Sequence, residues 1–243
     1  MDQVLTKAEK KAQRKLERQE WEEKLEQSEK QQKMKKWVLW GTIPVVLIAS
    51  VFGLYKLATA PSEAPAMTAP AVTAQDIATG SAQAKITVIE YSDFQCPACA
   101  AYHPFVKQLI AEEGSKIHFI YRFFPLTQIH QNALASARFA YAASLQGKFW
   151  QVNDILFEHQ SEWAELPDPT SQFMKYAQSL GLDTTKLQQD MNADSTLKFI
   201  NDEEDAGTTA GVNATPTFFV NGKSITNASN YDDFKNTVMG SEK

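Results

Sequence analysis

The feature that most limits the possible folds of this chain is a pair of cysteines, Cys96 and Cys99, at the junction of two different elements. The β-branched segment 86–89 before them is typical of a buried strand, and the segment 100–110 after them has the apolar spacing of a helix. Unpaired N–H groups and the positive end of the helix dipole favour a thiolate at such a junction. We therefore expect Cys96 to be an exposed, reactive thiolate. Cys99, one turn deeper, is placed to attack a mixed disulfide formed at Cys96.

No other cysteine occurs in the 243 residues, so a fold stapled by disulfides is excluded. Two other roles for the pair remain open. One is a pair of core cysteines without redox chemistry, and the other is a zinc site with His103 as a third ligand and no evident fourth. A c-type haem is excluded because Ala100 stands where that group requires a histidine. We predict no cofactor and no metal.

Residues 1–36 form a charged segment with eleven Lys/Arg and eight Asp/Glu. Favourable i,i+4 pairs, such as Glu26 with Lys30 and Glu29 with Lys33, predict a solvated, partly frayed helix. A coiled coil with a partner remains an alternative, although the leucines hold no heptad register. We expect this segment to be cytoplasmic, because of the apolar run that follows it.

Residues 37–58 form a run of 22 residues with a single charge, Lys56, and this length is enough to cross a bilayer. Three lysines precede the run, so the positive-inside rule predicts a single-pass anchor with a cytoplasmic N-terminus and the remainder of the chain outside the cell membrane. A signal peptide cleaved near residues 58–60 is the alternative. The long charged leader and the length of the apolar run favour the retained anchor.

Residues 59–84 are rich in Ala, Pro and Thr and predict a semi-extended linker. The folded domain is expected over 85–240. From residue 59 onwards, twelve Lys/Arg stand against twenty-one Asp/Glu, and this acidic balance argues against a nucleic-acid partner. We expect the acidic run 202–205 to lie on a solvated helix face.

The pattern after residue 84 is α/β. A second strand at 117–124 makes a right-handed parallel unit with the first strand and the cysteine-bearing helix. A long helical region follows over about 130–210. The Asn221-Gly222 dipeptide between two β-prone runs then predicts a hairpin, and 231–239 predicts a closing amphipathic helix.

Together these segments resemble the thioredoxin superfamily, and specifically its DsbA-like thiol–disulfide oxidoreductases. The segments that carry the resemblance are 90–99, 123–126, 146–150, 181–183 and 215–222. The resemblance implies a thioredoxin fold with a helical insertion between the second and third core strands, preceded here by a single transmembrane helix.

The resemblance also implies roles for single residues. Cys96 is implied to be the nucleophile and Cys99 the resolving thiol. Glu90 matches an acid beneath the active site that accepts a proton from Cys99, although a purely structural carboxylate is the alternative. Thr215 and Pro216 are implied to form a cis-proline loop that faces Cys96.

The substrate is implied to contact this loop and the residues between the cysteines, which are Pro97 and Ala98. These two lack the histidine of the most oxidising members of the superfamily, so we expect a milder oxidant.

The implied function is extracytoplasmic introduction of disulfides into cysteine-containing secreted or envelope proteins, with recharging by a quinone-linked membrane partner. A disulfide isomerase or reductase is the first alternative, and a non-enzymatic peptide- or metal-binding module is the second. A glycan at the Asn213-Ala214-Thr215 pattern would crowd the cis-proline loop, which favours a bacterial cell envelope.

Overall fold

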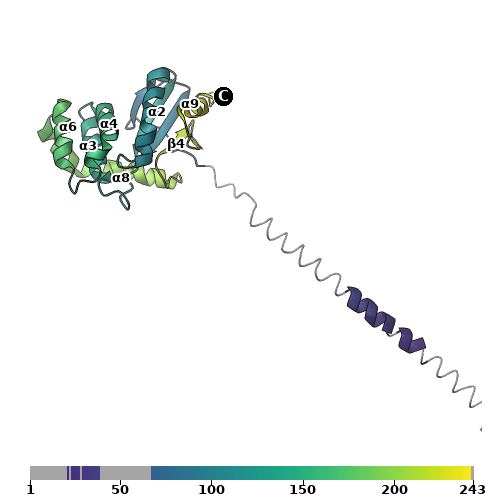
Figure 1. The fold of residues 1–243 in the computed structure, drawn as a ribbon. Helices are drawn as coiled ribbons and strands as arrows, with labels where there is room; N and C mark the ends of the chain where they lie inside the picture. The colour runs from purple at the N-terminus through teal and green to yellow at the C-terminus, as the bar shows by residue number, and fades with distance from the viewer. Residues whose placement is uncertain (1–20, 22, 28, 39–66, 242–243) are drawn as a thin grey trace, which may run out of the picture. The chain divides into compact units, whose positions relative to one another are not determined.

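The computed structural model describes residues 21, 23–27, 29–38 and 67–241, and the chain divides into two compact units at residues 64 and 65. In the N-terminal unit the described residues are helical and exposed (Figure 1). Lys30 Nζ lies 3.6 Å from the Glu26 carboxylate, and Lys33 Nζ lies 3.8 Å from that of Glu29. The described part of this segment is thus an exposed helix with two i,i+4 ion pairs.

Within the described residues, no helix combines the length and the apolar character that crossing a bilayer requires. The predicted membrane span 37–58 lies outside this part of the chain, apart from Trp37 and Val38, which are helical and exposed. The span stays a prediction.

The second unit is built on a five-stranded sheet with the order β1-β3-β2-β4-β5. β2 pairs parallel to β3, as the strand–helix–strand pattern predicts, and the other pairs are antiparallel. The strands are β1 (Ile77–Gly80), β2 (Ile86–Ser92), β3 (Ile117–Phe123), β4 (Thr217–Val220) and β5 (Lys223–Ile225).

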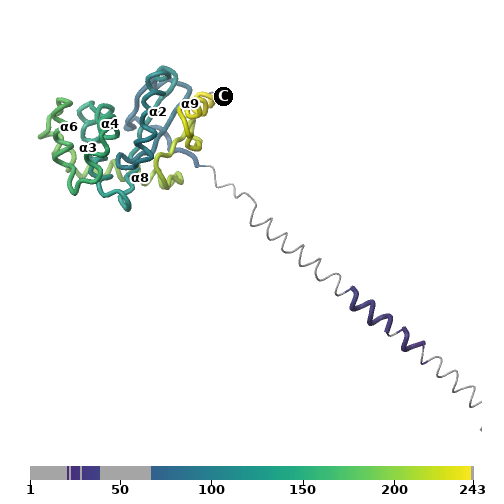
Figure 2. The backbone as a smooth tube through the Cα atoms, in the orientation of Figure 1, coloured from purple at the N-terminus to yellow at the C-terminus, as the bar shows by residue number. Residues whose placement is uncertain are grey.

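Two helices cover one face of the sheet beside the cysteines. α2 (Pro97–Glu113) and α9 (Tyr231–Met239) lie side by side there (Figure 2). They bury Val106, Leu109 and Phe234 against Val88 and Phe218 of the sheet. This burial of apolar surface is the main stabilisation of that face.

The helical insertion lies between β3 and β4, as predicted, and the structure describes this stretch completely. α3, α4 and α6 stand together beside α2, and α8 passes along the sheet (Figure 1). Gly207 of α8 lies so close to the sheet that an added Cβ would be 2.7 Å from the Tyr91 ring. The inserted helices are α3 (Ala133–Ser144), α4 (Phe149–Glu158), α5 (Gln160–Trp163), α6 (Thr170–Ser179), α7 (Thr184–Asn192) and α8 (Asp194–Thr209).

The predicted linker 59–84 is wrong over its described part, because the chain already joins the domain at Met67. The backbone of Ala69 donates to Gly222 O at 3.0 Å, and β1 adds an edge strand to β3. At the end of β1, Gly80 has φ +81°, and a Cβ there would lie 2.3 Å from Ile117 O. The strand exists through backbone pairing and a glycine rather than through apolar content, so its composition resembles that of a linker.

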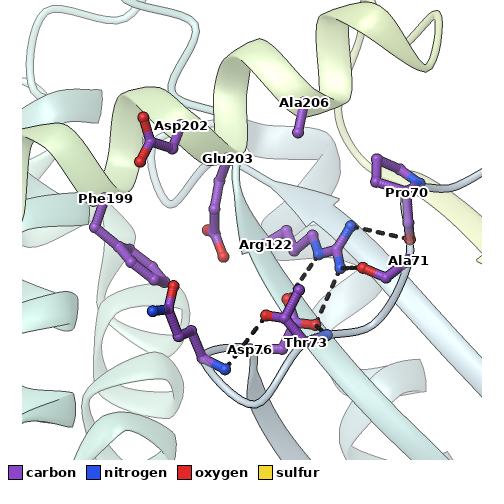
Figure 3. Close-up of a pocket in the computed structure, with 10 residues that line it drawn as sticks. Pro70, Ala71, Thr73, Asp76, Arg122, Phe199, Asp202, Glu203 and Ala206 are labelled. Carbon is purple, nitrogen blue, oxygen red and sulfur yellow. Dashed lines mark hydrogen bonds and ion pairs between the residues drawn. The ribbon is translucent and has the colours of Figure 1, made fainter.

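Arg122 of β3 fastens this early segment to the sheet (Figure 3). Its guanidinium, only 4% exposed, makes two hydrogen bonds to the Asp76 carboxylate, at 2.9 and 3.0 Å. It also donates to Ala71 O at 2.9 Å and to the Tyr91 hydroxyl at 3.1 Å. A buried charge is stable only when paired and hydrogen-bonded in this way.

The acidic run 202–205 departs from its prediction at one position. Asp202 and Asp205 are exposed, but Glu203 is only 8% exposed and accepts a hydrogen bond from Phe123 N at 2.6 Å. Burial raises the pKa of Glu203 to about 8, and its hydrogen bond with Phe123 partly offsets this. The run therefore contributes one acid to the domain interior at the end of β3.

We expect the Arg122→Met substitution to lower the free energy of unfolding by about 3–5 kcal/mol, because it leaves the Asp76 carboxylate buried without its partner. Urea denaturation measures this loss. Lys198→Met, which removes an exposed pair with Asp202, is the control and is expected to cost less than about 1 kcal/mol. Equal, small losses in both variants would contradict the structural role of Arg122.

Candidate active site

The two cysteines occupy the start of α2. Cys96 is the residue that precedes the first helical turn, and Cys99 lies inside that turn. The structure holds both as thiols. Cys99 is fully buried and Cys96 is 6% exposed, whereas Pro97 and Ala98 between them are exposed. The prediction that Cys96 is exposed is therefore wrong: the residue is mostly buried and lines a groove between the loop after β3 and the loop that contains Thr215.

The ionisation of the two thiols is strongly asymmetric. The pKa of Cys96 is lowered to about 5, chiefly because the Cys99 thiol donates a hydrogen bond to its sulfur. Burial opposes this effect, while the Thr215 side chain and the backbone N–H groups of Cys99 and Ala98 add to it. Burial raises the pKa of Cys99 well above its usual value, and Cys96 and Glu90 raise it further. At neutral pH the pair is therefore a Cys96 thiolate beside a Cys99 thiol.

Glu90 lies on β2, the central strand, paired with Tyr121 on one side and Phe218 on the other. Its carboxyl is fully buried, and this burial raises its pKa to about 7, an effect that the neighbouring Ser92 hydroxyl partly offsets. Its charge acts on Cys99, whose pKa it raises. Glu90 thus lies where the resemblance placed it, as an acid near the deeper thiol that can hold or release a proton near neutral pH.

The loop before β4 faces Cys96. The Thr215–Pro216 peptide bond is cis, and the Cys96 sulfur lies 3.4 Å from Thr215 O. The Thr215 hydroxyl is buried. The pairing of Thr217 with Tyr91 sets this position, since the residues just before β4 must then lie beside the end of β2.

Several polar side chains that brace the cysteines were not predicted. Gln160 donates to Phe94 O at 2.7 Å and to Cys96 O at 3.1 Å. Gln95 donates to Ala164 O at 2.7 Å and accepts from Asn132 N at 2.6 Å. These amides tie the inserted helices to the cysteine turn. From the sequence alone, polar residues in such segments are expected to be solvated. Their role becomes visible only from their position near Cys96 in the folded structure.

Asp93 is a second brace that sequence reasoning missed. Its buried carboxylate accepts hydrogen bonds from Gln95 N at 2.8 Å and Leu126 N at 2.9 Å, and lies 2.7 Å from His130 Nδ1. Asp93 therefore joins the turn that carries Cys96 to the loop after β3.

That loop forms one wall of a groove at the Cys96 sulfur, and the Thr215 loop forms another. Ile129 in this loop is 73% exposed, the kind of apolar side chain that a bound chain can cover. The lining residues are Cys96, Pro125, Leu126, Thr127, Gln128, Ile129, His130, Glu204, Asn213, Ala214 and Thr215.

The zinc alternative loses its third ligand. His103 points to α4, where its Nε2 lies 3.1 Å from Asp154. Lys107 bridges Asp154 and Glu158 in the same cluster, at 3.1 and 2.6 Å. Among the described residues, the group of metal-ligating side chains that contains His103 does not include the cysteines.

Most of the domain that carries this site matches a known protein family. A family model described as thioredoxin matches residues 72–239. The chain belongs to the thioredoxin family. Solved structures with the same fold include BdbD from Bacillus subtilis, at 19% identity and a TM-score of 0.64 over 74% of this chain and 99% of that one. Another is alpha-DsbA1 from Wolbachia pipientis, at 20% identity and 0.63 over 70% and 92%. At these identities the likeness shows the fold.

The curated proteins that resemble this chain in sequence are named as Na(+)/H(+) antiporters. It is 35% identical over 149 residues to the Na(+)/H(+) antiporter NhaA 3 of Salinispora tropica, covering 61% of this chain and 22% of that protein. It is 35% identical over 153 residues to NhaA 1 of Mycolicibacterium gilvum, covering 61% and 24%. The chain thus spans about a quarter of the length of these curated relatives.

Glu90→Gln tests the buried acid. In the unfolded chain Glu90 ionises near 4.5, while in the folded chain its pKa is about 7. Between these values the folded state keeps a proton that the unfolded state has lost. Stability therefore falls as pH rises through this window, by up to about 3 kcal/mol above pH 7. We expect Glu90→Gln to remove this loss, so that its stability relative to wild type is greater at pH 8 than at pH 5.

Urea denaturation at the two pH values measures the difference. Glu165→Gln, at an exposed position, is the control and is expected to follow wild type at both. A Glu90→Gln variant that also follows wild type would show that the Glu90 pKa is not raised by burial.

Proposed function

We propose that this chain is an extracytoplasmic thiol–disulfide oxidoreductase that introduces disulfides into secreted or envelope proteins through Cys96 and Cys99. The observation that carries the proposal is the asymmetry of the pair at the start of α2. The Cys96 pKa is lowered to about 5 beside the Thr215–Pro216 loop, and the Cys99 pKa is raised above its usual value near Glu90. A disulfide that leaves a stable thiolate on reduction is an oxidant.

The exchange follows from this asymmetry. In the oxidised form a substrate thiolate attacks Cys96, its sulfur bonds to the Cys96 sulfur, and the Cys96–Cys99 bond breaks with its electron pair on Cys99. The Cys99 thiolate takes a proton, for which Glu90 is the nearby donor. A second substrate thiolate then attacks the substrate sulfur and releases the Cys96 thiolate. The substrate has lost two electrons as a disulfide, and the enzyme holds them as the Cys96 thiolate and the Cys99 thiol.

The named neighbours support thiol–disulfide exchange as the reaction. They include alpha-DsbA2 from Wolbachia pipientis, which is described as a thiol-disulfide exchange protein and is 21% identical with a TM-score of 0.59. In our proposal the substrate chain contacts Pro97, Ala98, Thr215 and Pro216. Pro97 and Ala98 are exposed directly after Cys96, and Cys96 and Thr215 line the groove.

The setting is part of the same proposal. A membrane span over 37–58 would keep residues 1–36 in the cytoplasm and the catalytic domain outside, where disulfides persist. A quinone-linked membrane protein would then reoxidise the pair. The acidic surface of the domain fits protein substrates and no nucleic acid.

We expect a reduction potential between those of thioredoxin and DsbA, about −270 and −120 mV, because the Cys96 pKa of about 5 lies between the thiol pKa values of those proteins. Equilibration of the chain with glutathione buffers measures it. A value as high as about −120 mV would contradict the milder oxidant, and a value near −270 mV would favour a reductase.

We expect Cys99→Ala to accumulate a mixed disulfide with a disulfide-bonded peptide, because the thiol that resolves it is gone, and Cys96→Ser to form none. Non-reducing electrophoresis after acid quenching measures both. Oxidative refolding of a reduced protein and reduction of insulin then separate oxidase from reductase. If Cys96→Ser retains full activity, the chain is a binding module and the proposal fails.

A further inference from the structure

A histidine that the exchange chemistry above does not use lies in the groove at Cys96. His130 comes from the loop after β3 and lines the groove together with Cys96 and Thr215. Its side chain is 15% exposed, so it is accessible from the groove but mostly surrounded by protein. The inference drawn from it rests on the proposed function, because it concerns the same thiol exchange.

The ring is held in one orientation by Asp93. The distance from His130 Nδ1 to Asp93 Oδ2 is 2.7 Å, and the Asp93 side chain is fully buried. Asp93 also accepts two backbone N–H bonds, from Gln95 and Leu126, and such bonds stabilise a carboxylate. An ionised Asp93 can only accept, so Nδ1 carries the proton and Nε2 of the neutral ring is left as a base.

One titratable group contacts this ring, and two others line the same groove. Asp93 bonds it from the cysteine turn, Cys96 shares the groove from α2, and Glu204 lines the same groove from α8. Burial raises the pKa of the Glu204 carboxyl, and Asp205 beside it raises that pKa further. A role for His130 in the exchange therefore depends on the position of its ring in the groove and on its contact with Asp93.

We propose that His130 is a catalytic residue of the exchange, acting as the base that deprotonates the incoming substrate thiol, with Asp93 as its positioning residue. A substrate thiol near neutral pH is mostly protonated, and the thiolate is the species that attacks. His130 Nε2 takes the S–H proton as the substrate sulfur bonds to Cys96 and the electron pair passes to Cys99. The imidazolium then returns the proton to solvent, so no further reactant is needed.

The test is the rate at which the oxidised full-length chain reacts with a cysteine peptide, followed from pH 6 to pH 9.5. The variant His130→Asn keeps a side-chain donor near Asp93 but lacks Nε2. We expect its rate to be at least about tenfold lower at pH 7, within the effect of general base catalysis. The loss is expected to vanish at pH 9.5, where a thiol of pKa about 8.5 ionises without help.

Imidazole added to the buffer is expected to restore part of the rate of His130→Asn at pH 7, which a merely structural defect would not allow. The equilibrium constant with glutathione is expected to match wild type within about twofold, because a base changes rates and not equilibria. A control with the same local chemistry is His159→Asn, since His159 Nδ1 lies 2.7 Å from Glu162 outside the groove. Its rates should match wild type at every pH.

The pH dependence of the wild-type rate is a second test. It involves no substitution, so a folding defect cannot affect it. With a base in the groove, the wild-type rate per total thiol is expected to stay nearly level for at least about one pH unit below the thiol pKa. A tenfold fall per pH unit would overturn the proposal, as would a loss in His130→Asn that is the same at all pH values or no loss at all. A wild-type chain that reacts no faster than a small free disulfide would instead refute the proposed function itself.

Discussion

The pairing of β2 with β4 is the interaction on which the site depends. These strands hold Tyr91 opposite Thr217, so the turn after β2 and the loop before β4 must meet at the same edge of the sheet. Cys96 follows the first strand and Thr215 precedes the second, which places a sulfur and a carbonyl 119 residues apart in sequence at 3.4 Å. No local preference of either segment could produce this contact, which is a product of the sheet.

Burial and hydrogen bonding shift the pKa values of the two cysteines in opposite directions. Charge is costly in an apolar interior unless donors compensate for it, and at Cys96 hydrogen bonds outweigh the cost of burial. At Cys99 burial outweighs a hydrogen bond with the Asp93 backbone, and the charges of Cys96 and Glu90 raise its pKa further. Hydrogen bonds stabilise the anion of the outer thiol against its own burial, whereas burial keeps the inner thiol protonated. A pair of chemically identical side chains thereby obtains two distinct roles.

Local patterns predicted a large part of this architecture. The Asn221-Gly222 turn forms with φ of 48° and 81°, a conformation that these two residue types adopt at little cost, and α9 occupies its expected range. β1 escaped prediction because its strand character comes from its neighbour β3. Glu203 escaped it because charge runs are usually solvated, whereas one residue in a helix can face inward while its neighbours face water.

The candidate site divides in the same way. Cys96, Cys99 and Pro216 were recognisable because their motif is short and their neighbours have strong local preferences. The small exposure of Cys96 was not, since the amides and loops that cover it come from Gln160 and from the segment after β3. Asp93 and His130 were equally hidden, because a carboxylate and an imidazole 37 residues apart acquire meaning only when the fold brings them together.

The early start of the ordered domain limits how far it can stand from a membrane. Arg122 and β5 hold the chain from Met67 onwards, so the proposed span ending at residue 58 would leave fewer than ten residues before the domain, a chain length of about 30 Å at most. A linker lasting to residue 84 would have allowed about 90 Å. In that proposed arrangement the domain would stay in the layer next to the bilayer, where it would meet proteins as they emerge through the membrane.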